Sequence, residues 1–442
     1  MDANSTQKAP PRWALNFFTI WFGQSFSILG SQIVQFALIW WLTVKTGSAT
    51  VLTFSSIAGI VPQVLLAPLA GVLVDRWNRR ITMMVADGVG AAAAGVLAGL
   101  FVLGWVQIWH VFVILFIRSC AGAFHWPAMQ ASTSLMVPKQ HLSRIQGLNQ
   151  MLWGALGIIS APLGALVMDL IPLPSVVAID VVTAAFAITP LFFVYIPQPE
   201  RQPSTAQTAG EKPSVWADMK AGWRYVTGWK GAMIILLMAT LINLLVNPAF
   251  ALLPLLVKND FHGNAARLAV LESAMGFGMM AGGLTLGVWG GFRRRILTTF
   301  AGLIGMGMGI LLMGITPASL FVMAVVAMFV AGFMNPITNG PVHAVLQATV
   351  APEMQGRVFT LVGSIAALMS PIGLLIAGPL SDTIGVRTWF IVGGITTAVM
   401  GITCFFIPAA VHLEDGRQAT EEQQPAAILQ PADEKAPAVI TA

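Results

Sequence analysis

The stretch that decides the fold is Gly71-Val72-Leu73-Val74-Asp75-Arg76-Trp77-Asn78-Arg79-Arg80, which puts one acid and three bases into its last six residues. Apolar runs at roughly 49–70 and 81–104 flank it and carry almost no charge. Two membrane-spanning helices joined by a short charged turn explain this arrangement. Because Gly71 has no side chain, another helix can approach it closely. Asp75 can accept hydrogen bonds from the N-terminus of a neighbouring helix.

The composition of the whole chain also predicts a membrane protein. Of the 442 residues, 56% are hydrophobic and 9% are charged, whereas soluble domains carry about 25% charged residues. The net charge of +5 does not predict nucleic-acid binding, because the bases fall in short loops and not on one basic face. Cys120 and Cys404 both lie in apolar runs, so we expect no disulfide framework.

The length of the apolar runs predicts an all-α integral membrane protein, because a helix needs about 20 apolar residues to cross the hydrocarbon. The first run lacks a cleavage site and is interpreted as a retained helix. The twelve expected spans are 15–43, 49–73, 81–104, 108–136, 145–169, 175–196, 232–257, 268–289, 296–315, 318–346, 358–380 and 388–410.

The distribution of lysine and arginine predicts the orientation of these spans. Eighteen of the 23 bases fall on the side of the N-terminus, four fall on the other side, and Arg118 lies inside a span. Cytoplasmic loops carry such an excess of bases. We therefore expect both termini in the cytoplasm.

Similar loops recur in the second half of the chain, since Gly287–Thr298 aligns with Gly71–Thr82 after one residue is dropped. The second copy lacks an equivalent of Asp75. We therefore expect any role of Asp75 in locking the inner side closed to be confined to the first half. A further segment, Gly378–Arg387, has a sequence similar to that of the 71–80 loop. The predicted topology places it on the outer side of the membrane, so we do not interpret it as another copy of that loop. The predicted domains are an N-terminal six-helix bundle at 1–196, a cytoplasmic linker with an amphipathic helix at 197–231, a C-terminal six-helix bundle at 232–410, and a disordered cytoplasmic tail at 411–442.

Charged side chains inside spans are candidates for transport chemistry. A charge near the bilayer centre costs roughly 2.5–3.5 kcal/mol on insertion scales and normally faces a partner or a wet cavity. Arg118 lies near the middle of the fourth span, while Asp180 and Glu272 lie a short way into the sixth and eighth. Either carboxylate can carry a proton, or can be a rim residue that reaches water. For Arg118 the alternative is a structural role with backbone carbonyls or a nearby acid.

Uncharged polar side chains predict the wall of a substrate cavity. Gln24, Gln32 and Gln35 fall within about 80° of one another around the first helix. His125 lies seven residues after Arg118 on the same helix face. Two pairs of asparagines at i,i+4 spacing complete the candidates: Asn243, Asn247, Asn335 and Asn339. Hydrogen bonding between helices is the alternative role for all of them.

Asp87 differs from the other acids, because it lies near the cytoplasmic end of the third span. It follows Arg80 by seven residues, so we expect an ion pair near the inner gate in place of transport chemistry.

The residues quoted above resemble those of a known family. The pattern Gly71-x-Leu73-x-Asp75-Arg76-x-x-Arg79-Arg80 resembles the signature between helices 2 and 3 of the major facilitator superfamily. Bases alone are common in cytoplasmic loops, but the whole pattern is more specific. Ile114-x-x-x-Arg118-x-x-x-Gly122 resembles the fourth-helix motif of its proton-coupled drug exporters. The segments 116–128, 178–181 and 356–365 are similar to the macrolide-efflux branch of drug:proton antiporters.

This resemblance covers roughly residues 13–410 and implies the major facilitator fold in a cell (plasma or inner) membrane. It implies a secondary exporter that exchanges protons for bulky apolar drugs by alternating access. It also implies that Arg118 takes part in proton coupling. From their positions inside spans, we expect Asp180 or Glu272 to carry the proton. The residues of the gating loop would latch the inner side: Gly71, Asp75, Arg76, Arg79 and Arg80.

Two other functions stay open on the sequence alone. One is a same-fold exporter of an endogenous molecule such as a siderophore or a lipid, and the other is a non-transporting membrane sensor or scaffold. We expect no enzymatic activity, no metal and no cofactor, with the proton gradient as the energy source, because no nucleotide-binding loop occurs. The expected partners are a hydrophobic drug, protons and the lipid bilayer. We expect no nucleic-acid partner and a monomeric protein.

Overall fold

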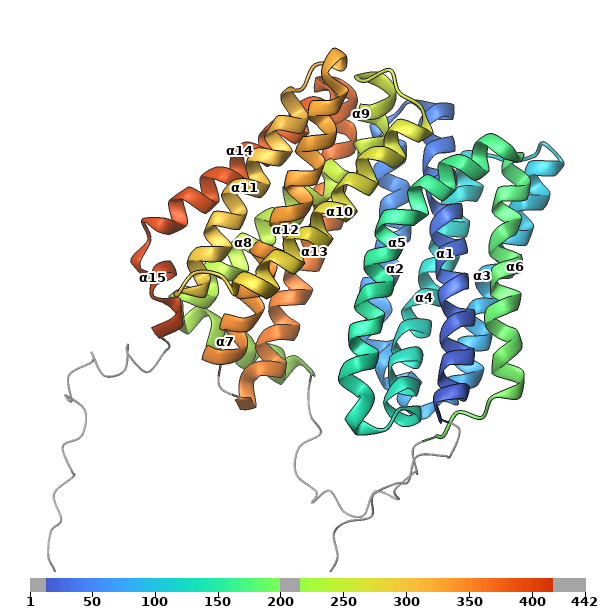
Figure 1. Ribbon diagram of the computed structural model, residues 1–442, viewed down its shortest axis with the longest axis horizontal. Coiled ribbons are helices and arrows are strands. Elements are labelled where there is room, and N and C mark those ends of the chain that lie inside the picture. Colours follow the sequence, from blue (N-terminus) through green and yellow to red (C-terminus); the bar gives the residue numbers. More distant parts are fainter. Residues whose placement is uncertain (1–12, 199–214, 351, 416–442) are drawn as a thin grey trace, which may run out of the picture.

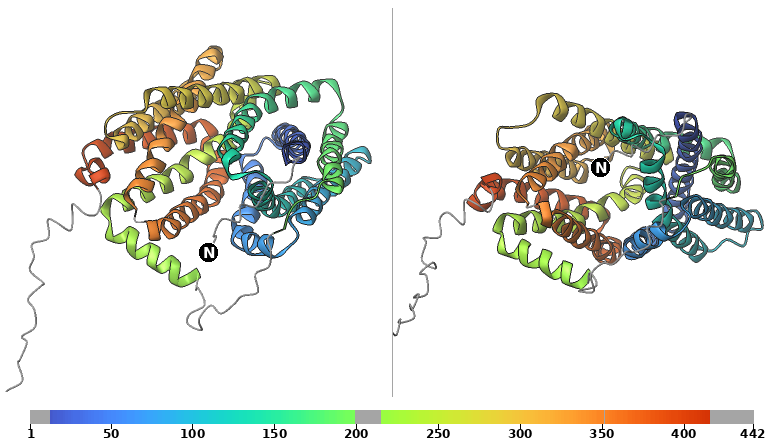
Figure 2. Two further views of the ribbon diagram at one scale, coloured as in Figure 1. Left: turned by 60° about the horizontal axis from the view of Figure 1, so that its bottom comes forward. Right: turned by 90° about the horizontal axis from the view of Figure 1, so that it is seen from below.

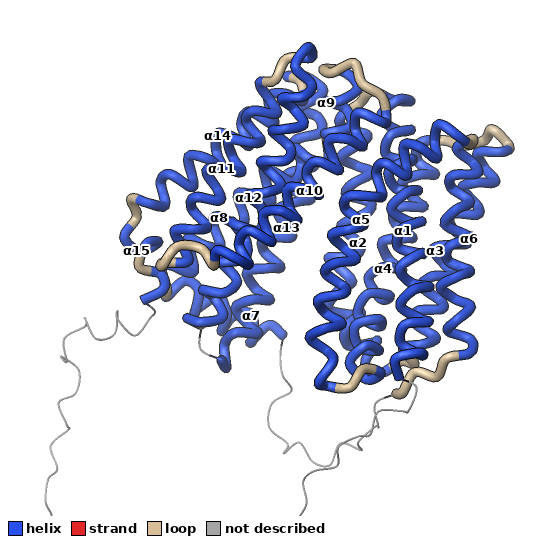
Figure 3. The backbone as a smooth tube through the Cα atoms, in the orientation of Figure 1, coloured by secondary structure: helices blue, strands red, loops and turns tan. Residues whose placement is uncertain are grey.

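The structure is a computed structural model that describes residues 13–198, 215–350 and 352–415. Within these ranges all regular structure is helical (Figures 1 and 3). The first part comprises α1 Trp13–Thr46, α2 Ala49–Arg76, α3 Arg79–Val102, α4 Ile108–Met136, η1 Lys139–His141, α5 Leu142–Leu170 and α6 Leu173–Phe193. The second comprises α7 Val215–Gly228, α8 Lys230–Ala251, α9 Leu253–Asn259, α10 Ala265–Trp289, α11 Arg295–Ile315, η2 Ala318–Leu320, α12 Phe321–Thr349, α13 Pro352–Ile384, α14 Val386–Phe405, α15 Pro408–Val411 and η3 Leu413–Asp415.

Twelve of these helices are long and apolar enough to cross a membrane, which confirms an all-α, multi-pass membrane protein. They coincide with the predicted spans to within a few residues, except that the span expected at 232–257 is divided into α8 and α9. Leu252 separates the two helices, and Pro254 lies in the first turn of α9. Proline fits a first turn but lacks the N–H that a continuing helix needs, which explains the break.

The spans form two groups that lie side by side (Figure 1). Helices α1–α6 make up the N half, and α8 and α10–α14 make up the C half, whose edge carries α7 (Figure 2). We call the end of the molecule that carries α9 and the α1–α2 link the α9 end. The opposite end, which carries α7 and the 71–80 loop, is the α7 end.

The two halves are in contact from the α9 end to about the middle of the spans and separate toward the α7 end. Near the middle of α5 and α10, a Cβ added to Gly276 would lie 2.8 Å from the carbonyl oxygen of Gly157. A Cβ added to Gly378 of α13 would likewise collide with the Thr53 hydroxyl of α2. Nearer the α7 end, Gly71 of α2 and Gly363 of α13 have no such neighbour within 4 Å. The ribbons of α2 and α13 also diverge there (Figure 1).

The segment after the N half forms a helix where the sequence predicts an amphipathic one. Helix α7 packs on the C half, with Val226 fully buried and Trp223 exposed. Most of the predicted linker lies outside the described residues.

The chain beyond the last span stays ordered to Asp415, although the tail is predicted from residue 411. Glu414 accepts a hydrogen bond of 2.6 Å from the backbone N–H of Ile296. The rest of the predicted tail, after Asp415, lies outside the described residues.

Candidate functional site

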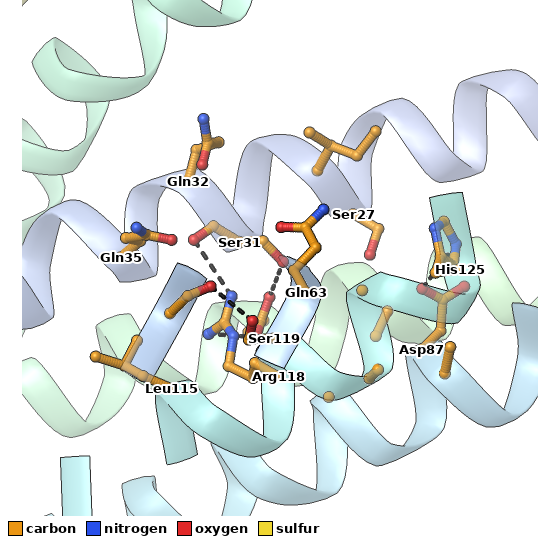
Figure 4. A pocket seen from close by; sticks show the side chains of 18 of the residues that line it. Ser27, Ser31, Gln32, Gln35, Gln63, Asp87, Leu115, Arg118, Ser119 and His125 are labelled. Carbon is orange, nitrogen blue, oxygen red and sulfur yellow. Dashed lines mark hydrogen bonds and ion pairs between the residues drawn. The ribbon is translucent and has the colours of Figure 1, made fainter. Parts of the chain in front are cut away.

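A polar cavity of about 370 Å³ lies among the helices of the N half. Its wall includes the three predicted glutamines Gln24, Gln32 and Gln35, all from α1. Figure 4 shows Ser31 of α1 in contact with Arg118 of α4, and Gln32 and Gln35 on the same helix as Ser31. The cavity therefore brings together several side chains that the sequence singles out.

An ion pair between the half-buried Arg118 of α4 and the buried Asp180 of α6 lines this cavity. Nη1 of Arg118 lies 2.8 Å from Oδ2 of Asp180. The hydroxyl of Ser31 donates a 2.7 Å hydrogen bond to Oδ1 of the same carboxylate, and Nη2 of Arg118 donates to the Ser31 carbonyl at 3.4 Å. Because both charges lie within spans, this mutual pairing offsets their cost in the apolar environment.

The packing of α4 holds Arg118 in this position. The hydroxyl of Ser119 donates a 2.6 Å hydrogen bond to the carbonyl oxygen of Gly59 in α2. One turn further along α4, the face at Gly122 has no neighbour within 4 Å of an added Cβ, which leaves room in the cavity. Helix α4 is therefore bound to α2 through Ser119, while the guanidinium of Arg118 contacts α1 and α6.

A second polar cluster joins Gln24, Asp87 and His125 in the same cavity. Nε2 of Gln24 donates a 3.0 Å hydrogen bond to Asp87. Nε2 of His125 lies 2.9 Å from Oε1 of Gln24 and 3.3 Å from Oδ1 of Asp87. Asp87 is thus paired with cavity residues, whereas Arg80, the partner that spacing predicts, donates to the carbonyl oxygen of Phe192 at 2.6 Å.

Glu272 lines a separate cavity of about 220 Å³ between α1, α5 and α10. Among the described residues, none forms a hydrogen bond or an ion pair with its carboxylate. The next residue, Ser273, donates a 2.9 Å hydrogen bond to the carbonyl oxygen of Ile158, which holds α10 against α5. Gln32 and Gln35 line this cavity as well as the larger one. The two carboxylates, Asp180 and Glu272, therefore border cavities that share one face of α1.

The predicted asparagines mostly bond within their own helices. Asn247 donates to the side chain of Asn243 at 2.8 Å, and Asn339 donates to the carbonyl oxygen of Asn335 at 3.0 Å. None of these four asparagines is among the described residues that line the two cavities. Their assignment to the substrate cavity stays a prediction.

The 71–80 loop, predicted to act in gating, contains a helix cap. The side chain of Asn78 accepts hydrogen bonds from the backbone N–H groups of Arg80 and Ile81 and so begins α3. Arg79 is buried and donates to the carbonyl oxygen of Ala131 at 3.1 Å. The side chain of Asp75 lies outside the described part of the structure.

Sequence reasoning missed Ser31 and Gln63, which also line the polar cavity. A signal for Ser31 existed: Gln24, Ser27, Ser31 and Gln35 recur every three or four residues and so form one polar stripe along α1. No comparable pattern surrounds Gln63.

Comparison with known sequences places the chain among transporters. The family model described as Major Facilitator Superfamily matches residues 20–374. The chain is 36% identical over 392 residues to Macrolide efflux protein A of Streptococcus pyogenes, which covers 89% of this chain and 96% of that protein. It is 35% identical over 328 residues to Macrolide efflux protein A of Enterococcus faecalis, covering 74% and 100%. It is 25% identical over 406 residues to Multidrug efflux pump Tap of Mycolicibacterium fortuitum, covering 87% and 94%.

Solved structures share the fold at low sequence identity. A mutant of the nucleoside transporter NupG superposes with a TM-score of 0.68 at 13% identity, covering 88% of this chain and 98% of that chain. A bacterial homologue of the iron transporter ferroportin, in an inward-facing state, gives a TM-score of 0.65 at 15% identity with the same coverage. These similarities establish the fold alone.

Proposed function

The chain belongs to the major facilitator superfamily, and on that basis we propose that it exports bulky apolar drugs, such as macrolides, in exchange for protons. Its relatives include macrolide and multidrug efflux proteins. Its twelve spans make it a multi-pass protein of the cell membrane. The sequence contains no nucleotide-binding loop, so we assign the driving force to the proton gradient.

The observation that carries the proposal is the unequal pairing of two carboxylates in the spans. Asp180 is held by Arg118 and Ser31, whereas Glu272 has no partner among the described residues and faces a cavity. A proton carrier has to gain and lose charge in every cycle. Neutralising Glu272 breaks no ion pair, but neutralising Asp180 would leave Arg118 buried without its partner. We therefore propose Glu272 as the carrier, with Asp180 as the second candidate.

In the proposed cycle the α7 end faces the cytoplasm, as the distribution of bases predicts. The structure is then an inward-open state, into which the drug binds between the halves. Closure of the α7 end, latched by Asp75, and opening of the α9 end release the drug outside. Glu272 takes up a proton there and releases it inside after the halves return. The membrane potential contributes about 2.3 kcal/mol per charge per 100 mV, and the pH gradient about 1.4 kcal/mol per unit.

A third cavity supports a bulky amphiphile as the substrate. It measures about 640 Å³ and lies toward the α7 end, with Trp77, Val85 and Phe124 in its apolar wall. Ala86 and Ala121 line both this cavity and the polar one. An apolar space beside a polar one suits a drug with a large hydrophobic surface and a few polar groups. The same feature favours the second candidate function, export of an endogenous lipid-like molecule.

The test is the uptake of a labelled macrolide into proteoliposomes, with an imposed pH gradient and with the gradient collapsed. We expect gradient-driven accumulation by the native chain. Glu272→Gln should lower accumulation to the level without a gradient. It should retain the exchange of labelled for unlabelled drug, because that exchange needs no net proton movement.

The matched control is Asp169→Asn, since Asp169 is an exposed acid in the last turn of α5. This control should accumulate drug like the native chain. Gradient-driven accumulation by Glu272→Gln would transfer the role to Asp180. A folded native protein without any accumulation would refute the macrolide assignment, and competition by candidate lipids for binding would then test the second function.

A further inference from the structure

The closed α9 end contains a contact between the halves that centres on Asp382, at the end of α13. Oδ1 of Asp382 accepts a 2.6 Å hydrogen bond from the backbone N–H of Ala49. Oδ2 accepts from the N–H of Thr50 at 3.1 Å and from the Ser48 hydroxyl at 3.0 Å. A carboxylate of the C half thus binds the first turn of α2 in the N half, where the helix dipole favours negative charge.

Lys258 of α9 makes the complementary contact at the end of α1. Its ammonium donates to the carbonyl oxygens of Thr43 at 2.9 Å and Val44 at 3.2 Å. Carbonyls in the last turn of a helix favour positive charge. The short link between α1 and α2 is therefore held from the C half by an acid at one side and a base at the other.

The segment that carries Asp382 has the same spacing as the gating loop. Gly378-x-Leu380-x-Asp382 ends α13, as Gly71-x-Leu73-x-Asp75 ends α2. At Gly378 the two helices are so close that an added Cβ would collide with the Thr53 hydroxyl and lie 3.0 Å from the Thr50 Cα. At Gly71 an added Cβ would meet nothing within 4 Å. The segment at Gly378 is therefore engaged where the halves meet, whereas the α2 face at Gly71 is open where they separate.

We propose that Asp382 and Lys258 are positioning residues. Their hydrogen bonds between the halves stabilise the closed α9 end and break when that end opens. This inference rests on the proposed alternation of access. Helix α2 does not need Asp382 in order to begin, because Ser48 already caps it by accepting a hydrogen bond from Val51 N–H. The bonds of Asp382 therefore bias the arrangement of the halves more than the folding of α2. Water can replace them when the halves part, which makes the contact reversible.

The test measures access to the cavity from each face of the membrane. The reporter is Ile39→Cys, because Ile39 lines both cavities, in a chain that also carries Cys120→Ser and Cys404→Ala. A membrane-impermeant maleimide is added to sealed vesicles of either orientation. The parent should react slowly from the α9 face. Asp382→Ala should react roughly fivefold faster from that face, the change expected when the loss of a side-chain helix cap shifts an equilibrium by about 1 kcal/mol.

Lys258→Gln gives an independent variant with the same expected direction. Asp260→Asn is the matched control, because Asp260 lies on the same rim but pairs within the C half, 2.6 Å from Nε of Arg387. Thermal unfolding of each variant shows whether it is folded. Folded Asp382→Ala and Lys258→Gln that both react as slowly as the parent would overturn the proposal, as would equal acceleration by Asp260→Asn. The assay uses neither drug nor pH gradient, so its outcome is separate from that of the flux test.

Discussion

At the scale of single residues, the presence of Arg118 and Asp180 inside membrane spans is explained by their pairing with each other. The side chains of Arg118 and Asp180 keep 14% and 5% of their exposure. Each charge alone would lie inside a membrane-spanning helix without a countercharge, and together they form one neutral, hydrogen-bonded unit with Ser31. Removing one member leaves the other uncompensated, whereas removing both does not.

This reasoning predicts the stability of three variants. Arg118→Met should lower the free energy of unfolding by about 3 kcal/mol, because it leaves Asp180 without its cation. The double variant Arg118→Met/Asp180→Leu should recover most of that loss. Thermal unfolding in detergent measures both effects. A double variant that is as unstable as Arg118→Met would contradict the charge argument, and gradient-driven flux by the double variant would show that the pair has no part in coupling.

The sequence reveals which residues are polar inside the spans, but it does not reveal their partners. Helical periodicity fixes the direction of Asp87 around its own helix only. Its pairing with His125 and Gln24 depends on how α1, α3 and α4 pack, which no spacing within one helix contains. Glu272 illustrates the same limit, since its cavity forms only where α10 meets α5 and α1.

At the scale of helices, the position of each span is predictable because the bilayer fixes the length of an apolar helix and lipid offers the backbone no hydrogen bonds. Contacts between helices are less predictable. Helices α10 and α12 approach so closely that a Cβ on Gly278 or Gly282 would collide with the carbonyl oxygens of Phe329 and Phe333, respectively. Without a hydrophobic force between helices in lipid, such close backbone packing stabilises their association.

Two neighbouring glycines in α10 provide a matched test of this packing. A Cβ on Gly282 would collide with the Phe333 carbonyl, while one on Gly283 would meet nothing within 4 Å. Gly282→Ala should therefore destabilise the protein by about 1–3 kcal/mol. Gly283→Ala should stabilise it by up to about 1 kcal/mol, because alanine loses less backbone freedom in a helix. Thermal unfolding compares the two, and equal effects would refute the packing argument.

At the scale of the whole molecule, the two helices that end in Gly-x-Leu-x-Asp lie against each other and run in opposite directions between the two ends (Figure 1). From the sequence alone, the segment Gly378–Arg387 is expected on the side away from the 71–80 loop and is not interpreted as a further copy of it. The structure adds that this segment contacts α2. A contact of this kind could not be predicted from spacing, because it depends on which end of the molecule is closed.

The two glycines of these segments should therefore shift the same equilibrium in opposite directions. Gly378→Ala puts a methyl group into the closed α9 end, against Thr53, so it should speed the reaction of the Ile39→Cys reporter from the α9 face. Gly71 faces open space in this state, and in our proposal it meets the other half only when the α7 end closes. Gly71→Ala should therefore disfavour closure there and slow the same reaction below that of the parent.

Each effect should lie between about twofold and tenfold, since overpacking costs roughly 1–3 kcal/mol and relaxation of the helices relieves part of it. Gly283→Ala serves as the control, because it adds the same methyl group to a helix without a close neighbour. If both glycine variants shifted the reaction in the same direction, the two segments would not act at opposite ends of one motion. Opposite shifts would mean that α2 and α13 each carry the contact that closes one face, and that each contact forms only when the other is broken.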